Sequence, residues 1–240
     1  DAKIIHIFNA EGDIVISRCH SSFKHFWMRG LKELNRLVSD EKNSAVEKFK
    51  KKLRWNKNET WFDLGGVGIL LYAVCSDEKN VVGELLKELK RSVEGEEYSR
   101  ILESRIRKEG YRTMGVPGGM TTLIASMIFS SPEVVSMLLR FGANPMCVDR
   151  IGTDSLMYAA IFGRSDNIKM WLSEFPKWNL SRGNRVNGAS VLHNAVSLGR
   201  QKLNTVKILV EFGADMFLRN DAGASILMNL MNNEDSDPCV

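Results

Sequence analysis

Hydrophobic and polar residues follow a pattern that returns five times along this chain. The first copy is GVGILLYAV at 66–74, and the others begin at Gly119, Gly152, Gly188 and Gly223. Each copy has a leucine at its fifth position: Leu70, Leu123, Leu156, Leu192 and Leu227. The third position holds Gly68, Thr121, Asp154, Ser190 and Ser225, residue types that cap helix N-termini. These columns predict five short helices, each starting just after a glycine turn and each pointing its leucine into the core.

A second apolar stripe with helical spacing follows two of these copies, in VVSMLLRFGAN at 134–144 and VKILVEFGAD at 206–215. Each stripe ends in Gly-Ala-Asn or Gly-Ala-Asp, where the glycine suits a left-handed helix C-cap. The starting glycines from Gly119 onward are 33, 36 and 35 residues apart. Periods of this size are typical of stacked supersecondary units.

With these columns established, the chain resembles the ankyrin-repeat family, whose pattern runs D-x-x-G-x-T-P-L-H-x-A-A, a second helix, then G-A-D. The closest copy is GASVLHNAV at 188–196, and Asp149 precedes the glycine of the copy before it. The Thr-Pro pair is intact in none of the five, so the repeats are divergent. The resemblance implies an all-α repeat fold, an ankyrin-type solenoid of helix-turn-helix units with short hairpin connectors.

The repeat array is predicted to cover residues 61–240. Gly66 and Gly119 are 53 residues apart, which leaves room for an insertion beyond one repeat. Asn232–Val240 is too polar and too short for a second helix, so the last unit is expected to be incomplete and unstable alone. The predicted boundaries are 61–93 for repeat 1, 94–115 for a helical insertion, 116–148 for repeat 2, 149–184 for repeat 3, 185–219 for repeat 4 and 220–240 for the incomplete repeat 5.

Residues 1–60 are predicted to form an N-terminal hairpin and a basic helical cap. The apolar runs IIHIF and DIVIS flank Asn9–Gly12 and indicate a small β-hairpin over 3–17. Helices are expected at about 21–38 and 41–55, as the polar-faced cap that a repeat stack requires. Basic side chains crowd the second of these helices: Lys48, Lys50, Lys51, Lys52 and Arg54.

Composition narrows the class of protein. The chain is 44% hydrophobic and 26% charged, with a net charge of +4, so there is no global case for nucleic-acid binding. Four scattered cysteines argue against a disulfide framework and fit a reducing compartment. The chain lacks a secretory signal and a long apolar run, so we expect an intracellular, cytoplasmic protein, with nuclear or organellar location left open. It begins with Asp, which indicates a processed chain or part of a longer protein.

Residues that suggest chemistry have simpler interpretations. Gly66 and Gly68 begin a dinucleotide-like loop, but Leu71 stands where its third glycine belongs. The resemblance implies that His193 ties its helix to neighbouring loops. Cys19, His20 and His25 match no zinc spacing. We therefore expect no catalytic residue, no cofactor and no metal, and do not expect an enzyme.

The resemblance implies a protein-protein interaction scaffold that binds a partner protein, alone or as a component of a larger complex, through the concave face of the array. Contacts in this family usually come from residues beside the connector glycine and from the ends of first helices. Those positions here are Ile128, Phe129, Ile161, Phe162 and Leu198 at helix ends, and Arg150, Ile151, Val186, Asn187 and Asp221 in connectors. Apolar helix ends in successive repeats predict a hydrophobic strip, covered either by a partner or by the insertion or N-terminal segment.

Two alternatives stay open at this point. The basic helix at 45–57 is a candidate for binding a nucleic acid or membrane surface, an interaction that added salt would weaken steeply. The repeats are also candidates for the regulatory or assembly arm of a larger enzyme, channel or complex.

Overall fold

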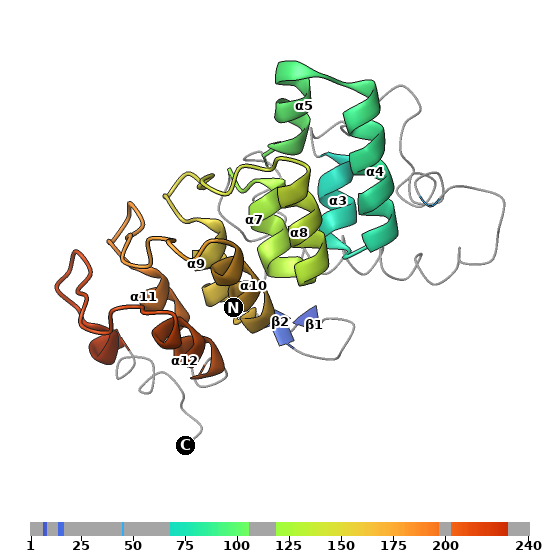
Figure 1. Cartoon of the computed structure of the whole chain (residues 1–240). Coiled ribbons are helices and arrows are strands. Elements are labelled where there is room, and N and C mark those ends of the chain that lie inside the picture. The colour runs from blue at the N-terminus through green and yellow to red at the C-terminus, as the bar shows by residue number, and fades with distance from the viewer. Residues whose placement is uncertain are drawn as a thin grey trace, which may run out of the picture. The chain divides into compact units, whose positions relative to one another are not determined.

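The computed structural model describes residues 7–8, 14–16, 45, 68–105, 119–196 and 203–229. It divides into two compact units, Asp1–Pro145 and Met146–Val240 (Figure 1). Strands β1 (Ile7–Phe8) and β2 (Ile14–Ile16) pair antiparallel, which confirms the predicted N-terminal hairpin. The two predicted cap helices and the five basic residues of the second lie outside the described residues, apart from Ala45, which is helical.

The first unit contains two helix pairs that match repeats 1 and 2. Repeat 1 forms α3 (Ile69–Cys75) and α4 (Lys79–Ser92), and repeat 2 forms α7 (Thr122–Phe129) and α8 (Pro132–Arg140). Each pair packs together, α3 packs on α7, and α4 packs on α8 (Figure 1). First helices therefore stack on first helices, and second helices on second helices.

The turns between the paired helices hold repeats 1 and 2 together. Asp77 adopts a left-handed backbone with φ of 50°, and its carboxylate accepts hydrogen bonds at 2.9 Å from the backbone N–H and the hydroxyl of Ser131. The buried Ser130 hydroxyl donates to the Val74 carbonyl at 2.7 Å. The Val74 carbonyl and the Asp77 carboxylate of repeat 1 thus both accept from residues of repeat 2. These bonds satisfy the polar groups of the turn and fix how repeat 2 packs on repeat 1.

The insertion forms the helix α5 (Gly95–Leu102), as predicted for 94–115. The Tyr98 hydroxyl donates to the Phe141 carbonyl, and the Glu103 carboxylate accepts from the Asn144 N–H at 2.7 Å. A backbone bridge then joins Arg105 to Thr121, across intervening residues 106–118 that lie outside the described residues. The insertion therefore packs beside the end of α8 and lengthens the connector before repeat 2.

The second unit contains the helix pairs of repeats 3 and 4. They are α9 (Ser155–Ile161) with α10 (Ser165–Glu174), and α11 (Val191–Val196) with α12 (Leu203–Glu211). Here α9 packs on α11 and α10 packs on α12, which repeats the arrangement of the first unit (Figure 1). Residues 226–229 begin the helix predicted for the fifth segment.

The predicted capping column is confirmed in four of the five copies. The side-chain oxygens of Thr121, Asp154, Ser190 and Ser225 each accept from the backbone N–H three residues later, at 3.3, 2.8, 3.5 and 3.4 Å. Gly68 precedes α3 at the same position and has no side chain to contribute. These bonds satisfy N–H groups that a helix start otherwise leaves without a partner.

The leucine column is confirmed in four copies and wrong in the fifth. Leu70, Leu123, Leu156 and Leu192 are each 1% exposed, whereas Leu227 is 69% exposed. Each buried leucine lies on a first helix that packs against the second helix of its own repeat. The described residues end at 229, so no second helix within them covers Leu227.

Candidate partner-binding surface

Three connectors of the second unit form tight hairpins, which we call finger A (147–154), finger B (179–190) and finger C (215–225). A backbone bridge between Val148 and Asp154 closes finger A, and one between Arg219 and Ser225 closes finger C. In finger B the Asn184 N–H donates to the Ala189 carbonyl at 3.1 Å. The predicted hairpin connectors are therefore present in this unit.

One acidic or amide side chain organises each finger from within. Asp149 accepts from the N–H groups of Ile151 and Thr153 at 2.9 and 2.8 Å, and from the Tyr158 hydroxyl at 2.7 Å. Asn184 and Asn220 each accept from two backbone N–H groups of their own fingers, at 2.9 to 3.1 Å. These side chains fix the turn in the way that Asx residues fix backbone turns.

Sequence reasoning identified Asp149 but missed Asn184 and Asn220. The signal was an Asp or Asn shortly before each starting glycine. It was obscured in finger B because Asn184 stands four residues before Gly188, whereas the other two stand three residues before their glycines. Finger B is one residue longer at this point, which breaks the register of the column.

Neighbouring fingers are hydrogen-bonded to each other through their backbones. The Arg185 N–H of finger B donates to the Ile151 carbonyl of finger A at 2.8 Å. The Asp221 N–H of finger C donates to the Asn187 carbonyl of finger B at 3.0 Å. Donors and acceptors recur at the same spacing, so the three fingers form a ladder that holds their tips side by side.

The starting glycines make room for this ladder. Gly152 and Gly188 have φ of 81° and 64°, a left-handed backbone that favours glycine. A Cβ at Gly152 would lie 2.7 Å from Cγ of Arg185, and one at Gly188 would lie 2.2 Å from the Asp221 carboxylate. The sequence predicted the turn, but not that the next finger rests on the glycine.

His193 has the structural role that the resemblance implied. It is 1% exposed, and its Nδ1 accepts from the Ser190 N–H at 3.3 Å. Nδ1 is therefore the unprotonated ring nitrogen, and Nε2 donates to the Ala224 carbonyl at 3.1 Å. The side chain joins the start of α11 to finger C.

A buried carboxylate supports the base of fingers A and B. The Arg182 guanidinium lies 3.8 Å from the Asp154 carboxylate and donates to the Gly152 carbonyl at 3.2 Å. Burial raises the pKa of the Asp154 carboxyl, against the opposing effects of the Met157 N–H, Arg182 and the Trp178 side chain. The Asp154–Arg182 pair connects the start of α9 to finger B, and the Arg182 guanidinium also holds the backbone of finger A at Gly152.

An aromatic cluster lies between α10 and finger B. The rings of Trp171 and Phe175 are 4.9 Å apart, and Trp178 meets Trp171 edge-on at 5.1 Å. Trp171 is fully buried, while Phe175 and Trp178 are half-buried. Such ring pairs stabilise a fold beyond the effect of the apolar area that they bury, so the cluster anchors the chain that leads into finger B.

The finger residues predicted to contact a partner lie at the tips of the ladder. Arg150, Asn187 and Asp221 are exposed, Val186 is 65% exposed and Ile151 is half-buried. The ladder brings them together as neighbours on three adjoining fingers.

The helix-end residues differ from the prediction. Ile128 is fully buried, so the expectation that it faces solvent is wrong. It lies on α7, which packs against both α3 and α8 and is buried along nearly its whole length. Phe129, Ile161 and Phe162 are half-buried, and Leu198 lies outside the described residues. Phe162 stacks on Tyr158 with ring centroids 6.5 Å apart, which accounts for part of its burial.

Exposed apolar side chains also occur where the sequence reasoning did not expect them. Met146 is 61% exposed beside finger A, and Phe217 is 84% exposed in finger C. Each stands four residues after a Gly-Ala glycine, Gly142 or Gly213. The shared position after the glycine could therefore have been recognised from the sequence. It lies in the segment that leads into each finger, before the tip.

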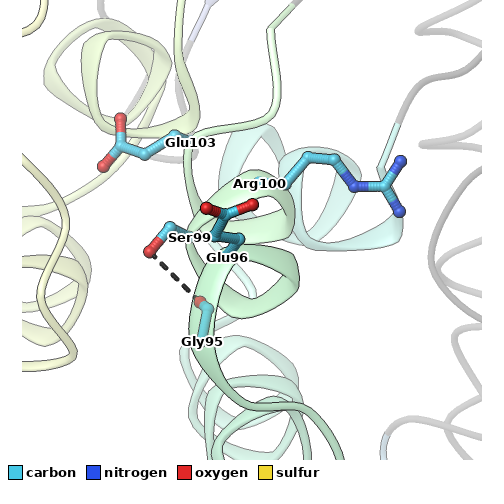
Figure 2. Close-up of a pocket in the computed structure, with 5 residues that line it drawn as sticks. All are labelled: Gly95, Glu96, Ser99, Arg100 and Glu103. Atoms are coloured by element: carbon cyan, nitrogen blue, oxygen red, sulfur yellow. Dashed lines mark hydrogen bonds between the residues drawn. The ribbon is translucent and has the colours of Figure 1, made fainter.

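A shallow hollow of about 670 Å³ lies along α5, lined by Gly95, Glu96, Ser99, Arg100 and Glu103. Figure 2 shows the Arg100 and Glu103 side chains extending in opposite directions from the helix. Arg100 pairs with Glu97 at 3.5 Å, and Glu103 accepts from Asn144. The charged groups of Arg100 and Glu103 thus point apart, and both already have protein partners.

Other candidate chemistry in the described part of the chain is limited. Burial raises the pKa of the Cys75 thiol to about 12, so this cysteine stays protonated at neutral pH. Within 68–105, 119–196 and 203–229, no three His, Cys, Asp or Glu side chains gather closely enough to hold a metal ion. None of the described helices has the length and apolar character needed to cross a membrane.

Comparison with protein-family models matches residues 187–221 to the Ankyrin repeat. The matched span runs from finger B through α11 and α12 to finger C, two residues later than the predicted repeat 4. Ankyrin repeats are in general modules that bind protein partners, and they are typically non-catalytic. Residues 187–221 are therefore similar to the Ankyrin repeat, and the helix pairs on either side of them in the sequence share the same arrangement within each unit.

Proposed function

We propose that this chain is a non-catalytic scaffold that binds a partner protein through the tips of its fingers. The observation that carries the proposal is the ladder of backbone hydrogen bonds, in which the Arg185 N–H donates to the Ile151 carbonyl and the Asp221 N–H donates to the Asn187 carbonyl. A surface already held in one arrangement loses little conformational freedom on binding. The ladder therefore favours recognition by a preformed surface.

The ends of the first helices extend this surface in the proposal. Ile161 and Phe162 end α9 and are half-buried, so each keeps part of its apolar area available to a partner. Interface energy is usually concentrated in a few such residues rather than spread evenly. We place the main contacts at the fingertips and secondary contacts at these helix ends.

The proposal is tested by comparing proteins captured from a lysate of the source cells. Val186→Asp places a charge at the fingertip, and Lys169→Glu changes an exposed charge on the second helix α10 as the matched control. A specific partner should be retained by wild type and Lys169→Glu but lost by Val186→Asp. Loss with the control variant alone, or equal retention by all three, would contradict fingertip binding. Chemical denaturation of each variant checks that folding is intact.

A further inference from the structure

The fingertips of the second unit have an uneven charge distribution. On fingers A and B the basic residues Arg150 and Arg185 are exposed. The acidic residues of the same two fingers, Asp149 and Asp154, are 3% and 1% exposed and are already hydrogen-bonded. These two tips therefore present positive charge to a partner.

Each of these arginines is followed directly by a β-branched apolar residue. Ile151 follows Arg150, and Val186 follows Arg185. Val186 is 65% exposed, and the hydrogen bond from Arg185 N–H to the Ile151 carbonyl brings the two pairs together. The result is a small apolar surface with a guanidinium from each finger, which we call the Arg-apolar patch (150–151 and 185–186).

The patch is held in place on both sides. The stem of Arg185 lies over Gly152, where Cγ occupies the space that a Cβ would need. On the other side, the Asp221 carboxylate of finger C lies over Gly188 and reverses the sign of the charge. Finger C carries the exposed Asp215 and Asp221 against one exposed arginine, Arg219, whose guanidinium donates to the Gly223 carbonyl. A carboxylate-bearing ligand is therefore attracted at fingers A and B and not at finger C.

We propose that the partner segment bound at this patch is an acidic peptide with a bulky apolar residue among its carboxylates. The inference rests on the proposed function and narrows it to one class of partner. Carboxylates pair with the forked guanidinium groups of Arg150 and Arg185, which favour such bidentate bonds. The apolar residue covers Val186 and Ile151, and Asp221 sets the end of the acidic segment.

The test selects short random peptides displayed on phage against the intact 240-residue chain. Enriched peptides should contain Asp or Glu beside Leu, Ile or Phe. Their synthetic, fluorescently labelled forms should bind about tenfold more weakly to Arg150→Glu/Arg185→Glu. Val186→Ser should weaken binding severalfold, and Lys169→Glu, which makes the same type of charge change away from the fingers, should leave it unchanged.

The outcomes separate this inference from the proposed function. Peptides that lose binding on Val186→Asp but lack acidic residues would overturn the inference and leave fingertip binding standing. Peptides that bind all the fingertip variants equally would count against both. A selection without enrichment, or equal loss with Lys169→Glu, would overturn the acidic-peptide assignment. Denaturation midpoints of the variants show whether any loss reflects unfolding.

Discussion

The first helices of the fourth repeat and the fifth segment have similar sequences, GASVLHNAV and GASILMNLM, but different burial. Leu192 is 1% exposed, and its counterpart Leu227 is 69% exposed. His193 is 1% exposed, and its counterpart Met228 is 48% exposed. The difference shows that the repeat pattern specifies which face is apolar, whereas burial depends on a neighbouring helix.

The fifth segment is nevertheless joined to repeat 4 on one side. Ile226 is 4% exposed, and the Ala224 carbonyl accepts from His193. On its other side, Leu227 and Met228 have no covering helix within the described residues. The segment thus packs on repeat 4, but within the described residues nothing packs on its opposite side. Four predictions test this contrast.

The largest expected difference concerns the matched leucines. Leu192→Ala removes a fully buried side chain, which commonly costs about 2–5 kcal/mol of unfolding free energy. Leu227→Ala removes an exposed one and should change stability by less than about 0.5 kcal/mol. Urea denaturation of the two variants measures both values. Equal losses would mean that Leu227 is covered in solution.

The matched glycines should differ next. Gly188→Ala and Gly223→Ala both place a side chain on a left-handed backbone, at a cost of about 1–2 kcal/mol. Only Gly188 has the next finger resting on it, whereas nothing lies within 4 Å of a Cβ at Gly223. Gly188→Ala should therefore cost about 1 kcal/mol more, as overpacking usually does. Denaturation curves of the pair give the difference, and the reverse order would contradict the ladder.

The matched sixth-column residues should show a smaller contrast. His193→Ala removes the acceptor of the buried Ser190 N–H and one of the two donors to the Ala224 carbonyl, which keeps the Asn220 N–H, at a cost of about 1–3 kcal/mol. Met228→Ala should cost less than about 0.5 kcal/mol because its side chain is largely exposed. Thermal unfolding of both variants separates the two cases. A neutral His193→Ala would rule out the proposed link between α11 and finger C.

The smallest effect is expected in local opening. Amides at 226–229 should exchange with deuterium faster than those at 191–196, because partly covered segments open with less free energy than core helices. Mass spectrometry of peptides from the two segments provides the rates. Strong protection at 226–229 in the isolated chain would contradict the view that the fifth segment is unstable without a cover.

Much of the fold was predictable because repeats reveal themselves by comparison within one chain. The glycine, capping and leucine columns located the first helices α3, α7, α9 and α11, and the two apolar stripes located the second helices α8 and α12. The apolar runs near the N-terminus located the hairpin. The insertion was predicted from spacing alone. Its packing beside Phe141 and Asn144 was not, since such contacts depend on tertiary placement.

The candidate site was predicted only where local sequence determines exposure. A fingertip residue such as Val186 projects from a hairpin, so its position beside the glycine is informative. Ile128 lies in the last turn of a helix that packs against two others, and no local pattern distinguishes it from Phe129, which ends that helix. The link between Arg185 and Ile151 joins different repeats and is therefore absent from any single repeat's pattern.

Fingertip binding is tested most directly by photo-crosslinking in the source cells. A photoreactive phenylalanine analogue replaces Val186 at the tip of finger B in one variant and Lys169 on α10 in the other. Both positions are exposed, so both side chains can react with a bound protein. The account predicts a partner crosslink from position 186 and none from position 169. A crosslink to the same partner from 169 but not from 186 would contradict it.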